Sequence, residues 1–152
     1  MFNNIQDPIN NQWYSIDSNI GKSILRKYLK FNGGGNNRVQ QIYDNNKLTN
    51  FLNENNNNYK IIGFFSDLCA HCIKTKPAWE KLNRLLENNS IDVKQATVDC
   101  TLDGFNGNDI TKKNNINGFP TIRLYKKNKD EIVEFTSERT PSNLLAFIKE
   151  NI

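Results

Sequence analysis

Two cysteines separated by two residues, Cys69-Ala70-His71-Cys72, stand where a predicted strand ends and a predicted helix begins. The strand is the apolar run 61–65, and the helix shows apolar residues at helical spacing, Trp79, Leu82, Leu85 and Leu86. The free N–H groups and partial positive charge of a helix N-terminus favour a thiolate, so the pKa of Cys69 should be lowered. Cys72, one turn later, can reach the same sulfur. A cysteine pair of this spacing inside a βαβ pattern predicts a redox motif.

The composition is that of an ordinary globular chain. Of its 152 residues, 37% are hydrophobic and 24% charged, which suits one domain with some additional sequence. Frequent Asn, Ile and Lys are typical of an AT-rich genome. The net charge of +4 includes no block of five like charges, so we expect no nucleic-acid binding. No apolar run approaches the roughly 20 residues of a membrane span.

The start of the chain, residues 1–8, lacks both a basic region and an apolar core, so we expect no secretory signal peptide. Three cysteines, two of them in one short motif, do not describe a disulfide-stapled secreted domain. Cysteine usage does not fix the compartment, but the expected lack of a signal peptide favours the cytoplasm or a virus particle over the lumen of the endoplasmic reticulum.

Residues 1–37 are interpreted as an N-terminal extension, and residues 38–152 as the main domain. Ser18 or Asn19 could cap a helix. Its apolar residues fall on one face, with basic residues elsewhere: Ile20, Ile24, Leu25 and Tyr28, against Lys22, Arg26, Lys27 and Lys30. The glycines at 33–35 end this helix and form a flexible joint. Three roles remain open: docking on its own domain, binding a partner or second copy, or lying on a membrane surface.

The main domain alternates strand and helix patterns. Strands are predicted at 39–43, 61–66, 93–100, 121–125 and 131–135, with a turn at 126–130. Helices are predicted at 47–52, at 69–87 with an interruption and kink at Pro77, at 109–114, and from Thr140-Pro141 onward. This order predicts an α/β fold, a mixed sheet with helices on both faces.

Further motifs stand along the chain in this order: Phe64-Phe65-Ser66-Asp67-Leu68 directly before the cysteines, Pro77, Val98-Asp99-Cys100-Thr101, Gly118-Phe119-Pro120-Thr121, and Arg139. With them, residues 38–152 resemble the thioredoxin superfamily, and within it a protein disulfide isomerase domain. The resemblance implies a thioredoxin-like fold, thiol–disulfide exchange without metal or organic cofactor, and a cis peptide bond before Pro120.

One departure from the family pattern lies behind the second cysteine. Gly63 occupies the strand position where the family carries a buried carboxylate that takes the proton of this cysteine. The usual lysine partner is also missing, since Gln95 and Thr97 hold the nearby strand positions. We therefore expect dithiol chemistry to persist, with the proton of Cys72 passing to water or another group.

The catalytic candidates are Cys69, Cys72, His71 and Arg139. Cys69 is expected to attack and Cys72 to resolve the mixed disulfide, with Cys72 the more buried thiol of higher pKa. His71, the only histidine, would stabilise the Cys69 thiolate. The resemblance implies that Arg139 is a mobile cation lowering the pKa of Cys72, although a solvated arginine is an equal alternative. Cys69, His71, Cys72 and Cys100 could supply four ligands to zinc, but no second ligand pair stands at zinc-finger spacing, so we expect no metal.

The substrate-binding candidates surround the cysteines. Pro120 would shape a groove, and the backbone of Phe119 could pair with an extended substrate strand. Leu68, where the family has Trp, and Ala70, where it has Gly, would line the same surface.

Three other residues receive structural interpretations. Lys74 and Lys76 are expected on a solvated helix face, and Cys100 as a small buried residue.

Two functions follow. The first is a thiol–disulfide oxidoreductase of isomerase or oxidase character, acting on protein substrates through mixed disulfides. The second is a binding or structural module of thioredoxin fold with weak redox activity, for example a virus particle component, suggested by the missing acid and Trp. In either case the N-terminal helix could hold a partner or a second copy.

Overall fold

A computed structural model describes residues 3–7, 11–32, 39–55, 59–103, 109–126 and 131–152. A five-stranded mixed sheet organises this part of the chain, in the order β3-β5-β4-β6-β7. Its strands are β3 (Gln40–Ile42), β4 (Tyr59–Phe65), β5 (Val93–Asp99), β6 (Thr121–Tyr125) and β7 (Ile132–Glu134). The first three are parallel to one another, and β6 and β7 are antiparallel to their neighbours. The predicted turn at 126–130 lies largely outside the described residues.

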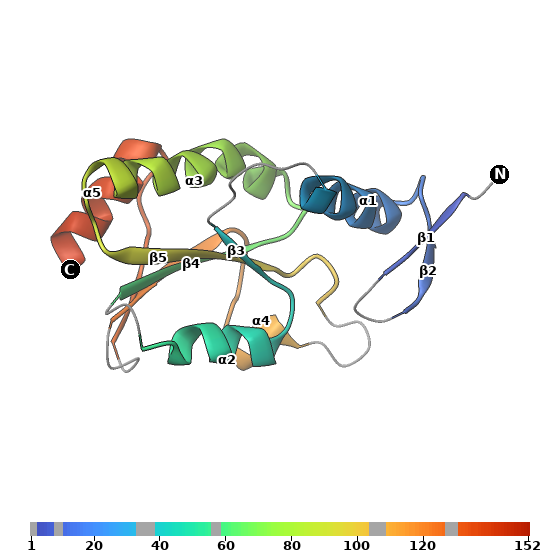
Figure 1. The fold of residues 1–152 in the computed structure, drawn as a ribbon, viewed down its shortest axis with the longest axis horizontal. Coiled ribbons are helices and arrows are strands. Elements are labelled where there is room, and N and C mark those ends of the chain that lie inside the picture. Colours follow the sequence, from blue (N-terminus) through green and yellow to red (C-terminus); the bar gives the residue numbers. More distant parts are fainter. Residues whose placement is uncertain (1–2, 8–10, 33–38, 56–58, 104–108, 127–130) are drawn as a thin grey trace.

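Helices cover both faces of the sheet, as predicted (Figure 1). Helices α3 (Ala70–Asn88) and α5 (Pro141–Asn151) lie on one face, and α2 (Asn45–Asn53) and α4 (Ile110–Lys113) on the other. Side chains fix two of the starts. The Asp44 carboxylate accepts from the backbone N–H of Lys47 at 2.8 Å, and the Thr140 hydroxyl accepts from that of Asn143 at 3.2 Å.

The expected interruption at Pro77 is wrong. Helix α3 runs unbroken from Ala70 to Asn88 with Pro77 inside it. A proline removes one backbone donor, and the remaining hydrogen bonds of a helix of this length carry the chain past that position.

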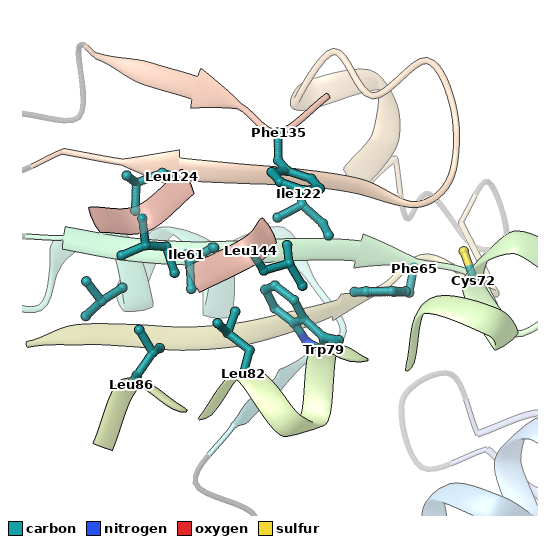
Figure 2. Close-up of a cluster of buried hydrophobic side chains, with 12 residues drawn as sticks. Ile61, Phe65, Cys72, Trp79, Leu82, Leu86, Ile122, Leu124, Phe135 and Leu144 are labelled. Atoms are coloured by element: carbon teal, nitrogen blue, oxygen red, sulfur yellow. The ribbon is translucent and has the colours of Figure 1, made fainter. Parts of the chain in front are cut away.

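The pleat of β4 divides its side chains between two cores. Ile61 and Phe65 point toward α3 and α5, whereas Ile62 and Phe64 point toward α2 and α4. Figure 2 shows the first core, in which residues of β4 and β6 pack against those of α3 and α5. This is the core that the second cysteine, Cys72, joins.

The N-terminal segment holds one unpredicted element and one predicted helix. Strands β1 (Asn4–Gln6) and β2 (Trp13–Ser15) form a separate antiparallel hairpin. Helix α1 (Asn19–Asn32) begins where expected, since the Ser18 hydroxyl accepts from the N–H of Gly21 at 2.9 Å. Ile24 is buried and Leu25 is exposed, so these two apolar residues of one predicted face do not share one environment. The side chain of Tyr28 and the glycines at 33–35 lie outside the described residues.

Helix α1 lies beside the start of α3 (Figure 1). The hydroxyl of Ser23, itself buried, donates to Oδ2 of Asp67 at 2.7 Å. Of the three roles left open for this helix, docking on its own domain is the one that a contact supports.

Candidate redox site

The two cysteines occupy different positions at the start of α3. Strand β4 ends at Phe65, a short loop follows, and Cys69 takes the cap position with extended backbone, φ −100° and ψ 119°. Cys72 lies in the first turn and is fully buried, whereas Cys69 is half-buried. The junction of strand and helix therefore leaves one thiol reachable and closes the other inside the core.

The surroundings of Cys69 favour its thiolate. Burial raises the pKa of Cys69 to some extent, but three hydrogen bonds outweigh it: those from the backbone and thiol of Cys72 and from the backbone N–H of His71. The charge of Arg139 acts in the same direction, and the net result is a pKa below the ordinary thiol value. This is the effect expected of a helix N-terminus. His71 contributes through its backbone, and its own side chain is exposed.

Cys72 has the opposite environment. Burial raises the pKa of Cys72 to about 12, against which the backbone N–H of Ser66 acts as a donor to Sγ at 3.4 Å. The half-buried thiol of Cys69 is thus the one that ionises readily, and the buried thiol of Cys72 stays protonated at neutral pH.

The loop that leads into β6 contacts Cys69. The peptide bond between Phe119 and Pro120 is cis, as the resemblance implied. The Cys69 thiol donates to the carbonyl of Phe119 at 3.5 Å, and the Arg139 guanidinium donates to the carbonyl of Pro120 at 3.2 Å. The structure thus brings these predicted residues together. The charge of Arg139 lowers the pKa of Cys69, and its implied action on Cys72 stays a prediction.

Exposed apolar side chains flank the cysteines. Leu68 is 56% exposed immediately before them, and Ile73 is 55% exposed immediately after them, while Ala70 is also exposed. Ile73 was missed in the sequence. The signal was available, because an isoleucine off the buried stripe of a helix must face solvent or a partner.

The space at Gly63, behind Cys72, is filled by aromatic rings. A Cβ atom at this position would lie 2.2 Å from Cε2 of Phe65 and 3.1 Å from Cζ2 of Trp79. The two rings pack with centroids 5.6 Å apart, and in Figure 2 Phe65 lies between Trp79 and Cys72. The missing carboxylate has therefore left no cavity that a larger side chain could enter.

The polar residues near Gly63 hold Trp79. Its indole N–H donates to Oγ1 of Thr97 at 2.8 Å, and its carbonyl accepts from Nε2 of Gln95 at 2.7 Å. Gln95 and Thr97, at the strand positions where the family's lysine is missing, thus hold Trp79 beside Gly63.

One expectation about the helix surface is wrong. Lys76 is not simply solvated, because its ammonium group forms a close ion pair with Oδ1 of Asp67. The backbone N–H of Asp67 donates to Oγ1 of Thr101 at 2.9 Å. Lys74 is exposed, as expected.

Cys100 is buried, as predicted, and burial raises its pKa. In the part of the chain that the structure describes, no group of three or more His, Cys, Asp or Glu side chains is placed to hold a metal ion. The described helices also include none long and apolar enough to cross a membrane.

Comparison with known proteins agrees with this geometry. Residues 39–150 match the family model for thioredoxin. A thioredoxin domain-containing protein 5 homolog from Drosophila melanogaster is 30% identical over 91 residues, covering 60% of this chain and 21% of that protein. A protein disulfide-isomerase from Arthroderma benhamiae is 35% identical over 95 residues, covering 60% and 17%.

The chain thus spans about a fifth of the length of these relatives. Among solved structures, the first thioredoxin domain of mouse protein disulfide-isomerase A4 superposes with a TM-score of 0.60 at 24% identity, covering 75% of each chain. The chain belongs to the thioredoxin family, and part of it is similar to segments of protein disulfide-isomerases.

Proposed function

We propose that this protein is a thiol–disulfide oxidoreductase that acts on protein disulfides through Cys69 and Cys72. The observation that carries the proposal is the contrast between the two thiols, one half-buried with a lowered pKa and one fully buried with a raised pKa. Thiol exchange needs one reachable thiolate to attack and a second thiol to resolve the product.

In the reductive direction, the Cys69 thiolate attacks a substrate disulfide, and one substrate sulfur leaves as a thiolate. Cys72 then gives up its proton and attacks Sγ of Cys69. The Cys69–Cys72 bond forms, the mixed disulfide breaks, and the second substrate sulfur leaves. In the oxidative direction the same steps run backward from the Cys69–Cys72 disulfide. His71, in our proposal, favours the dithiol form and so gives the couple an isomerase-like or oxidase-like character.

The surroundings of Cys69 support a protein substrate. Leu68 and Ile73 present apolar side chains on either side of the cysteines, and Ala70 leaves the approach to Cys69 unobstructed. We propose that Phe119 and the buried Pro120 line the groove in which an extended segment lies. Arg139 supports the thiolate from the opposite loop.

We also propose that residues 38–152 form the exchange domain and residues 1–37 an extension to it. The matched family region, 39–150, agrees with that division.

Reduction of insulin by dithiothreitol, with and without the protein, tests the activity. We expect turnover for the wild type, none for Cys69→Ser, and trapped mixed disulfides for Cys72→Ser. Cys100→Ser is the matched control, since this thiol is buried in the other core, under α2 and α4. A wild-type rate equal to background would favour the alternative, a binding module. Full multi-turnover activity of Cys72→Ser would contradict the two-thiol mechanism.

A further inference from the structure

The polar groups around the loop before Cys69 form a connected chain. Ser23 of α1 donates to Oδ2 of Asp67, and Lys76 of α3 binds the other oxygen, Oδ1. Only 12% of the Asp67 side chain and 31% of the Lys76 side chain are exposed. Asp67 is thus bound at both carboxylate oxygens and at its backbone N–H, so its side chain has little freedom to move.

The position of Asp67 determines where the Lys76 charge lies. Lys76 follows Cys72 by four residues, so the two side chains share one face of α3. Its partner, Asp67, lies in the loop before the helix begins. The lysine side chain must therefore extend back toward the helix N-terminus, along the turn that carries Cys72, which is the direction that helical side chains prefer.

Cys72 needs such a charge because the family's usual proton acceptor is absent. Position 63 has no side chain, and the rings of Phe65 and Trp79 occupy the space. Burial raises the pKa of Cys72 to about 12, and the charge of Lys76 acts against that rise. Among the described residues, Cys69 at the helix cap adds to the rise in the pKa of Cys72, Cys100 after β5 also interacts with this thiol, and the Asp67 carboxylate is the partner of Lys76.

We propose that Lys76, held by Asp67 and Ser23, is a positioning residue for the resolving step, and that helix α1 is thereby part of the redox site. The inference rests on the proposed function. Lys76 does not touch the reacting sulfurs; its fixed charge stabilises the Cys72 thiolate as the proton leaves to water. That thiolate then attacks Sγ of Cys69, the Cys69–Cys72 bond forms, and the substrate sulfur departs with the electron pair of the broken bond.

Two-phase kinetics separate this step from the first attack. Reduced protein is mixed in a stopped-flow instrument with two different peptides joined by a disulfide and carrying a donor and a quencher. Attack by Cys69 releases the first peptide, and resolution by Cys72 releases the second. Rates are followed from pH 6 to 10 for the wild type, Lys76→Met, Lys76→Gln and Lys76→Arg, with Lys74→Met as the matched control on the same helix.

We expect both neutral variants to keep the first phase and slow the second. Each unit by which the pKa of Cys72 rises lowers its thiolate fraction tenfold at pH 7. The more basic thiolate is also the better nucleophile, with a Brønsted coefficient of about 0.4–0.5. The rate of the second phase should therefore fall by roughly threefold or more. The rate of the second phase should stay below that of the wild type at every pH from 6 to 10, a range that lies below the pKa of Cys72. Lys76→Arg should restore it, and Lys74→Met should match the wild type.

Ser23→Ala tests the part assigned to α1. We expect a smaller slowing of the second phase, and no additional slowing when Ser23→Ala is combined with Lys76→Met, because both changes act through the same charge. An equal effect of Ser23→Ala in both backgrounds, or none in either, would overturn the role of α1.

Two results would overturn the proposal in different ways. If the wild type shows both phases and Lys76→Met has the same second-phase pH profile as Lys74→Met, the role of Lys76 is wrong while the proposed function stands. If the wild type shows neither phase above the level of Cys69→Ser, the proposed function fails, and this inference fails with it.

Discussion

The two faces of the central sheet are built differently. The face under α2 and α4 is packed with apolar side chains such as Phe51, Ile62 and Phe64. The face under α3 and α5 also has an apolar core, but it includes buried Gln95 and Thr97, a strand glycine and the thiol of Cys72. Cys72 belongs to this second core, whereas Phe119, which accepts a hydrogen bond from Cys69, packs against both cores.

The difference shows how a site can lose a charged group and keep its core. Burying a carboxylate requires partners for it, and removing one leaves a space that must be filled. Here the Phe65 ring and Trp79 fill the space at Gly63, and Thr97 satisfies the indole N–H. The core under α2 and α4 contains neither thiol of the Cys69–Cys72 pair.

The largest expected effect comes from restoring a carboxylate on the site face. Gly63→Glu should destabilise the fold by more than about 4 kcal/mol, because its first carbon already overlaps the Phe65 ring and its charge is buried. We expect no faster resolution at Cys72, since the carboxylate has no room beside it. Urea denaturation measures the loss. Gly63→Ala should lose about 1–3 kcal/mol, and adding Phe65→Leu should recover part of that. Stability within about 1 kcal/mol of wild type for Gly63→Glu would contradict the description of a filled face.

A large loss of stability in the core under α2 and α4 should leave the ionisation of Cys69 unchanged. Phe51→Ala removes a fully buried ring from the core under α2 and should lower the free energy of unfolding by about 3–5 kcal/mol. The titration of the Cys69 thiolate, followed by its absorbance near 240 nm, should be unchanged in the folded variant. A shifted Cys69 titration would show that the two faces are coupled.

Alkaline pH probes one buried thiol on each face, Cys72 and Cys100. Below about pH 8.5, the ordinary thiol pKa, both are protonated in the folded and unfolded chain, so stability does not change. Above it the unfolded chain releases protons that the fold retains, because burial raises the pKa of both thiols, that of Cys72 to about 12. Stability should fall by up to about 1.4 kcal/mol per pH unit and per thiol.

Thermal or urea unfolding of the wild type, Cys72→Ala and Cys100→Ala between pH 8 and 11 measures this slope. Each variant should show a shallower loss than the wild type. Burial raises the pKa of Tyr43 to about 12 as well. Tyr43 is present in all three proteins and adds the same amount to the slope, so its contribution cancels in the comparison. An unchanged slope for Cys72→Ala would mean that its thiol ionises as it does in water.

The smallest effect concerns an exposed side chain at the edge of the site face. His71→Pro should lower the reduction potential of the cysteine pair by roughly 30 mV, equal to about 1.4 kcal/mol for two electrons, because a group that favours the thiolate is lost. Equilibration with glutathione buffers measures the potential, and Lys74→Met is the control. An unchanged potential would mean that His71 does not tune the dithiol.

Much of this protein was predictable because the signals are local. The spacing of Cys69 and Cys72, the caps at Ser18 and Thr140, and the alternation of strand and helix patterns depend on neighbours within a few residues. Together they predicted the sheet, the helices on both faces and the different environments of the two cysteines. The short hairpin of β1 and β2 was missed because strands of three residues carry too little alternation to be read.

Only the tertiary structure decided how distant residues complete the site. The ring that fills the space at Gly63, the ion pair that binds Lys76 to Asp67, and the reach of Ser23 from α1 each join side chains from different elements. Local periodicity says which face of an element is buried, but not which partner it meets. A polar or charged side chain is interpreted from the sequence as solvated, and its real role depends on the group that the fold places within hydrogen-bonding distance.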